Sequence, residues 1–206
     1  MRGETEVLSK YLPEKAINLV FQTIVSGNIQ LRISRARKSK LGDFRAAVNG
    51  GPHRVSVNRD LNPFHFLIVF VHELAHVVVH ERYGRSVQAH GSQWKMAFRE
   101  LMKPYFELGV FPEDIELSLS RYLQNAKAIN GTDLQLAKVL ARYDTRVVSG
   151  TDLEKLPSGS LFKIPSGRVF RKLDKQRKRY KCQCVESGRL YLFNPIAKVE
   201  LVNAND

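Results

Sequence analysis

Hydrophobic residues recur at helical spacing in the first two thirds of the chain. From Pro13 they form one stripe that Gly27 ends, which predicts a helix facing the core. After Pro63 the chain runs without Gly or Pro to Tyr83, and its apolar content predicts one long, mostly buried helix over 63–83. Further helices are expected over 92–103, where Pro104 ends the pattern, and over 134–142, with an irregular stretch from 104 to 120.

Alternating apolar and polar residues predict strands in two regions. Three short segments at 28–37, 43–49 and 53–59, separated by turn-forming residues, indicate a small antiparallel sheet. After about Gly150, short alternating segments are divided by Pro-Ser-Gly, Glu-Ser-Gly and Asn-Pro, which predicts a compact all-β module. We therefore expect an α+β protein with a domain at 1–150 and a small basic β module at 151–206, the boundary lying between 144 and 160.

The charge of the chain adds a possible partner to this picture. Its 206 residues include 33 Lys and Arg against 20 Asp and Glu, a net charge of +13. Such an excess favours a polyanionic partner such as nucleic acid, although a generally basic protein has the same composition.

Targeting signals and cysteines indicate a cytoplasmic protein. The first twenty residues lack the basic start, apolar stretch and cleavage site of a signal peptide. The densest apolar run, Phe66 to Val71, is far shorter than the ~20 residues of a membrane span, so no membrane partner is expected. Cys182 and Cys184 are two residues apart on a predicted strand, where disulfide geometry is unfavourable.

Within the long predicted helix, the segment Val71-His72-Glu73-Leu74-Ala75-His76 carries candidate chemistry. One helical turn separates His72 from His76, so their imidazoles can converge on one Zn²⁺. Glu73 lies beside them and can act as the general base that takes a proton from the attacking water. The alternative is that the histidines of this region are ordinary helix and loop residues that bind no metal. The helical context makes this alternative the less favoured one.

A catalytic zinc commonly takes three protein ligands, and the remaining histidines of the chain supply the candidates. His80 continues the ladder, but about 12 Å of helical rise separates it from His72. The pair His76 and His80 has no glutamate after its first histidine, so it lacks the base. His90 follows a loop that can turn back toward the helix, and we expect it to be the third ligand.

A family resemblance rests on these residues. The segment 57–94, which holds His-Glu-x-x-His and a later His-Gly followed by an aromatic, resembles the SprT-like zinc metallopeptidases, as does the Lys-x-Gly turn of "KSKLGDFR" upstream. That family includes the Spartan proteases, which digest proteins crosslinked to DNA. The likeness covers roughly residues 10 to 105 and implies a zincin-like domain with His72, His76 and His90 as zinc ligands and Glu73 as general base.

The chain also departs from related patterns. Some family members carry a four-cysteine zinc ribbon, and here Cys182 and Cys184 have no second pair, so a structural zinc of that kind is excluded. His90 comes fourteen residues after His76, which separates the chain from metzincins. The chemistry also requires a donor to the oxyanion, for which His53, Tyr83 and Tyr143 are candidates.

Two basic clusters could contact phosphates. The first spans residues 32–45 and the second, with Phe170 and Tyr180 interleaved, spans 168–181. We expect the two aromatic rings to lie in the core of the β module rather than to stack on bases, and we expect Trp94 and Phe98 to pack the following helix onto the histidine helix.

Three functions fit these observations. The first is a zinc-dependent metalloendopeptidase that acts on DNA-associated or DNA-crosslinked proteins. The second is a nucleic-acid-binding module with a non-catalytic zinc site, although such a site needs no base such as Glu73 and normally has four protein ligands. The third is a zinc hydrolase that cleaves RNA, which the carboxylate after the first histidine disfavours.

Overall fold

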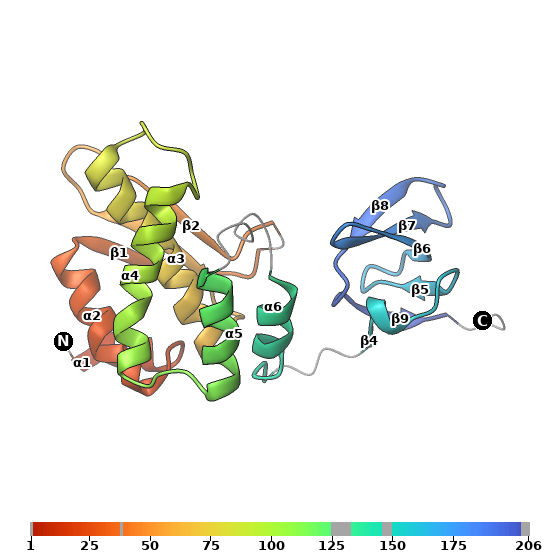
Figure 1. The fold of residues 1–206 in the computed structure, drawn as a ribbon, viewed down its shortest axis with the longest axis horizontal. Helices are drawn as coiled ribbons and strands as arrows, with labels where there is room; N and C mark the ends of the chain where they lie inside the picture. Colours follow the sequence, from red (N-terminus) through yellow and green to blue (C-terminus); the bar gives the residue numbers. More distant parts are fainter. Residues whose placement is uncertain (1, 38, 125–132, 146–149, 203–206) are drawn as a thin grey trace. The chain divides into compact units, whose positions relative to one another are not determined.

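The computed structural model describes residues 2–37, 39–124, 133–145 and 150–202. Contacts divide the chain into two compact units, Met1–Thr145 and Arg146–Asp206. The first unit combines helices with a small sheet and the second contains a separate six-stranded sheet, so the expected α+β class is confirmed (Figure 1).

Helices make up most of the first unit, and a three-stranded sheet lies among them. Its helical elements are α1 (Arg2–Ser9), the 3₁₀ turn η1 (Glu14–Ala16), α2 (Ile17–Ser26), α3 (Pro63–Tyr83), α4 (Ser92–Glu107), α5 (Glu113–Gln124) and α6 (Leu134–Ala141). Its strands are β1 (Ile29–Ser34), β2 (Gly42–Arg45) and β3 (His53–Asn58).

The sheet has the order β1-β3-β2 and is mixed, which corrects the antiparallel sheet expected from the sequence. β1 pairs with β3 in parallel, whereas β2 pairs with β3 antiparallel. β3 is the central strand, and its Val55 and Val57 are both fully buried. One face of this strand packs against α3, and its alternate residues Arg54 and Ser56 lie on the opposite face.

The long helix α3 begins and ends where the sequence predicts. The side chain of Asn62 caps it by accepting a hydrogen bond from the His65 N–H at 2.9 Å, and Pro63 takes the first position. Gly84 ends it with φ at 59°, a left-handed conformation that favours glycine. Although α3 is long and apolar enough to cross a membrane, most of it is buried within the unit.

Two predictions were wrong: the end of the helix expected at 92–103, and the irregular stretch expected at 104–120. α4 continues through Pro104 to Glu107, since a proline within a helix removes one backbone donor and the Leu108 N–H still bonds to the Pro104 carbonyl at 3.0 Å. The stretch expected to be irregular contains α5, whose Ile115 and Leu119 are fully buried one turn apart.

The second unit is all-β in its described strands, which pair antiparallel in the order β4-β9-β5-β6-β7-β8. Its core holds Phe162, Phe170 and the two free cysteines Cys182 and Cys184. Its elements are β4 (Thr151–Asp152), the 3₁₀ turn η2 (Leu153–Lys155), β5 (Leu161–Lys163), β6 (Val169–Gln176), β7 (Arg179–Cys184), β8 (Leu190–Phe193) and β9 (Lys198–Leu201).

Candidate metal centre

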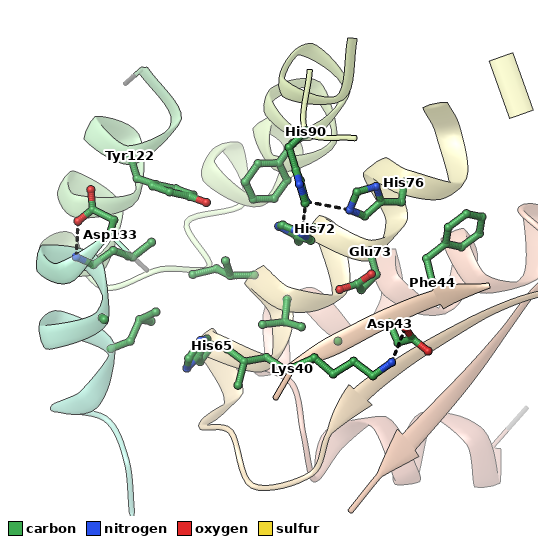
Figure 2. A pocket seen from close by; sticks show the side chains of 18 residues that line it. Lys40, Asp43, Phe44, His65, His72, Glu73, His76, His90, Tyr122 and Asp133 are labelled. Carbon is green, nitrogen blue, oxygen red and sulfur yellow. Dashed lines mark hydrogen bonds and ion pairs between the residues drawn. The ribbon is translucent and has the colours of Figure 1, made fainter. Parts of the chain in front are cut away.

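Three histidines converge in the first unit. His72 and His76 lie one turn apart on α3, and His90 reaches them from the loop before α4 (Figure 2). The Nε2 atom of His90 lies 3.1 Å from Nε2 of His72 and 3.1 Å from Nε2 of His76. In the described part of the chain, these three residues form a group whose ligand atoms lie within 4.8 Å of one another.

This spacing fits a tetrahedral zinc site. Zinc binds imidazole nitrogen at ~2.0–2.1 Å, so two nitrogens at tetrahedral positions lie ~3.3 Å apart. The observed separations of 3.1 Å are close to this value. Three imidazole ligands would leave a fourth tetrahedral position open to water or substrate, whereas a structural zinc site normally has four protein ligands.

The loop that carries His90 has an uncommon backbone. His90 has φ at 57°, in the left-handed region that non-glycine residues rarely adopt. The next residue, Gly91, caps α4, and a Cβ atom on it would lie 2.9 Å from the Gln88 carbonyl oxygen. The loop thus turns sharply into α4 and directs the His90 ring back toward α3.

Trp94 is a core residue that contacts all three histidine rings. Its ring centroid lies 4.5 Å from that of His72, 5.4 Å from His76 and 4.7 Å from His90. Phe98 stacks on Trp94 at 4.9 Å, and each side chain is 1% exposed. The expectation that α4 packs onto α3 through these two residues is confirmed.

Burial keeps these three histidines neutral. The pKa of His72 is lowered to about 3 and that of His76 to about 4, chiefly by burial and to a smaller extent by the neighbouring imidazoles. Burial also lowers the pKa of His90. At neutral pH all three side chains are therefore uncharged and able to bind a metal ion.

Glu73 lies beside this cluster with its carboxyl group buried. Burial and the nearby Asp43 raise the pKa of Glu73 to about 7, against the opposing charges of Arg37 and Lys40 and a hydrogen bond from the Phe44 backbone N–H. A carboxyl group with a pKa near the working pH is suited to exchange protons with a reacting water, and a bound cation would hold it more firmly in the ionised state.

A cavity of about 540 Å³ joins the histidines to α5 and α6. Residues 40–44, which precede and form β2, line one side, and Tyr122 of α5 lines another. Figure 2 shows the Tyr122 hydroxyl pointing into the cavity in the direction of His72. Burial and Asp133 raise the pKa of Tyr122, so its hydroxyl stays protonated and can donate a hydrogen bond.

His80 and the three candidate oxyanion donors lie outside this cavity. His80 packs near Phe44 and His53, and is not in the three-histidine group. His53 accepts a hydrogen bond from the Ala47 N–H at 3.1 Å, and Tyr143 donates one to Asp114 at 2.6 Å. Tyr83 is 39% exposed near the end of α3. None of the three candidate oxyanion donors lines the cavity, which Tyr122 lines instead.

Tyr122 is not predicted as a site residue from the sequence, because no helix is expected at 113–124. The stripe of Ile115, Leu119 and Leu123, four residues apart, was the signal for that helix. Placing Tyr122 next to the histidines still requires knowing how α5 packs on α4, which no local pattern gives.

The first basic cluster forms part of a surface on the outer face of the small sheet. Four arginines, with Ser34 and Ser56, line a shallow hollow of about 230 Å³, and we call them the basic sheet face: Arg32, Arg37, Arg45 and Arg54. Arg54 was not in the predicted cluster, and it joins because it pairs in register with Arg45. Lys38 of the predicted cluster lies outside the described residues.

One residue of the second basic cluster is buried in the β module. Lys172 is 3% exposed and donates hydrogen bonds to the carbonyls of Leu156 and Glu154, so it does not face solvent. Phe170 is fully buried, as expected, and Tyr180 is half-buried beneath the Lys172 ammonium, 4.0 Å from its ring centroid. Arg168, Arg171, Lys175, Arg177, Lys178 and Arg179 are exposed.

Comparison with known proteins adds no relative: no family model, curated protein or solved structure matches this chain.

Proposed function

We propose that the chain is a zinc-dependent endopeptidase of the SprT-like kind that acts on proteins bound or crosslinked to DNA. One observation carries the proposal: three neutral imidazoles converge beside a buried carboxyl group at the wall of a cavity. A structural zinc site has four protein ligands and needs no base, so this arrangement favours turnover over a non-catalytic site.

His72, His76 and His90 would hold the ion, which when bound supplies a Lewis acid to polarise the scissile carbonyl and acidify water. Glu73 accepts the proton of the attacking water and passes it to the leaving amine, a shuttle that its raised pKa permits. Tyr122 donates a hydrogen bond to the oxygen that gains negative charge.

The strand beside the cavity favours a polypeptide substrate. β2 is the outer strand of its sheet, and residues 42–44 of this strand line the cavity. An extended peptide can pair with such an edge, which aligns its backbone with the catalytic residues. A folded RNA has no equivalent way to pair with a strand edge.

The basic sheet face supports the nucleic-acid part of the proposal. One acidic residue, Asp43, lines the same hollow, and it pairs with Lys40 and Arg45. Guanidinium groups suit phosphates because they offer paired donors. A surface of this kind would bind the phosphate backbone without reading sequence.

The test compares cleavage of one protein in its free form and crosslinked to single-stranded DNA. We expect crosslinking to speed cleavage by the wild type, and Glu73→Gln to cleave neither form. Arg32→Glu combined with Arg54→Glu should abolish the acceleration by DNA and leave cleavage of the free protein unchanged. The matched control is Arg82→Glu with Arg85→Glu, which makes the same charge change at exposed residues outside the hollow.

Each outcome bears on one part of the proposal. Equal cleavage of free and crosslinked protein would contradict the DNA part alone. No cleavage by the zinc-loaded wild type would contradict the peptidase and favour a nucleic-acid-binding module with a non-catalytic zinc.

A further inference from the structure

Beyond the histidines, the cavity continues along α3 into a part lined by hydrocarbon. Ile68 and Val69 lie one turn before His72 and Glu73 on the same helix face. The facing wall comes from α6, where Leu136 and Leu140 are buried and Ala137 is half-buried. We call this part of the cavity the apolar pocket, and its residues are Ile68, Val69, Leu136, Ala137 and Leu140.

The apolar pocket lies within reach of a side chain next to the reacting bond. One helical turn, ~5.4 Å along the axis, separates Ile68 from His72. Neighbouring residues of an extended peptide are ~3.3 Å apart along the strand, and alternate side chains point to opposite faces. A peptide whose carbonyl lies at the histidines can therefore place the side chain of one adjacent residue in the pocket.

The lining determines which side chains the pocket accepts. Four acidic or basic side chains line the cavity, Lys40, Asp43, Glu73 and Asp133, whereas the five pocket residues are all apolar. His65 lines the cavity one turn before Ile68 and Val69, and burial lowers its pKa, so it is uncharged at neutral pH. An apolar side chain gains free energy on entering such a space, whereas a charged one loses its hydration.

We propose that the apolar pocket binds a large apolar side chain, such as Leu, Met or Phe, of the residue that flanks the scissile bond. This residue thus determines which bond is cleaved, whereas attachment to DNA determines which protein is cleaved. This inference rests on the proposed peptidase function. Full burial of a side chain of this size corresponds to a preference of roughly 10- to 100-fold over Gly or Ala at the same position.

Ala137 is the position at which a larger side chain can test the pocket. Its methyl group is the smallest side chain on the α6 wall, so Ala137→Phe places a ring in the space that the substrate would occupy. The matched control is Ala141→Phe, since Ala141 lies on the same helix, is exposed and does not line the cavity.

The first experiment maps the cleavage sites. The zinc-loaded full chain is incubated with an unfolded protein, and the products are identified by mass spectrometry. The wild type and Ala141→Phe should cleave where Leu, Met or Phe occupies one fixed position beside the broken bond. Ala137→Phe should cleave those sites at least tenfold more slowly and shift toward Gly, Ala and Ser.

A second measurement separates this inference from the peptidase proposal, because it requires no cleavage. Leucine hydroxamate and glycine hydroxamate carry the same metal-binding group and differ in the side chain. The zinc-loaded wild type should bind leucine hydroxamate at least tenfold more tightly, and Ala137→Phe should abolish this difference. Equal affinity of the wild type for both compounds would overturn the inference, as would cleavage sites with no apolar preference.

Discussion

Gly42 on β2 lies directly against the side chain of Glu73 on α3. A Cβ atom added at Gly42 would be 2.7 Å from Cγ and 2.8 Å from Cδ of Glu73, closer than real Cβ atoms approach their neighbours. The absence of a side chain at this position allows the strand to pass over the carboxyl group, and the Phe44 N–H two residues later bonds to it. The Lys-x-Gly turn therefore has a direct steric purpose at the site.

Gly42→Ala should displace the Glu73 carboxyl group and reduce kcat/KM about 100-fold, because a shift of ~1 Å in a catalytic group has effects of this size. Zinc content should remain at the wild-type level, since Gly42 contacts no ligand histidine. Gly51→Ala is the control, because its Cβ would meet only the Val48 carbonyl at 3.3 Å. Full activity in Gly42→Ala would show that the position of Glu73 does not matter for the reaction.

Substitutions at His90 and at His80 should have different effects on zinc affinity. His90→Ala should weaken zinc binding by more than about 100-fold. Loss of a metal ligand should reduce the affinity more than loss of a residue that only hydrogen-bonds to a ligand. His80→Ala should leave the affinity unchanged. The single tryptophan of the chain, Trp94, contacts all three ligand rings, so its fluorescence reports the titration. Equal affinities of the two variants would contradict the ligand assignment.

Tyr122→Phe tests the proposed donor to the developing oxyanion. Removing one such donor should lower kcat about 100-fold and change KM little, because the hydrogen bond strengthens as charge develops. Tyr143→Phe is the matched control: its hydroxyl bonds to Asp114, outside the cavity, so kcat should remain unchanged. A wild-type kcat in Tyr122→Phe would assign the oxyanion to another donor.

The metal-free protein should become less stable as pH falls below 6.5. The folded state holds the pKa of His72 at about 3 and that of His76 at about 4, whereas in the unfolded chain both have ordinary values near 6.5. Between these values the unfolded chain binds more protons, so these two groups make the free energy of unfolding rise with pH across this window. Glu73 acts in the opposite sense, because its pKa of about 7 exceeds the ordinary 4.5 and its contribution is lost as pH rises between them.

A double variant isolates the contribution of the two histidines to the pH dependence of the free energy of unfolding. In His72→Gln/His76→Gln the Glu73 contribution remains, so the stability advantage of the wild type over this variant should grow as pH rises from 4.5 to 6.5. Urea unfolding of both metal-free proteins at several pH values measures it. An advantage that does not vary with pH would contradict the depressed pKa values.

The sequence predicts α3 well because local signals define both of its ends. Asn62 and Pro63 begin the helix and Gly84 ends it, and the two histidines within it share a face by helical periodicity alone. The position of His90 also follows from sequence, because a loop of this length between two helices returns the chain to the first.

The remaining features depend on contacts between distant segments. Strand order is one: β1 pairs with β3 in parallel, and the short alternating segments of the sequence do not indicate which strands pair or in which direction. The cavity is another, since α5 and α6 bring Tyr122 and Ala137 to α3 across more than forty residues of chain. Arg54 joins the basic sheet face only through strand register.

The central claim is that His72, His76 and His90 hold a zinc ion at which Glu73 catalyses peptide hydrolysis. The most direct measurement determines zinc content and cleavage of an unfolded protein together, in the wild type and in Glu73→Gln. The account predicts one zinc per chain in both proteins and a loss of cleavage of about 10²- to 10⁴-fold in the variant. Cleavage by Glu73→Gln at the wild-type rate, with zinc bound, would contradict it.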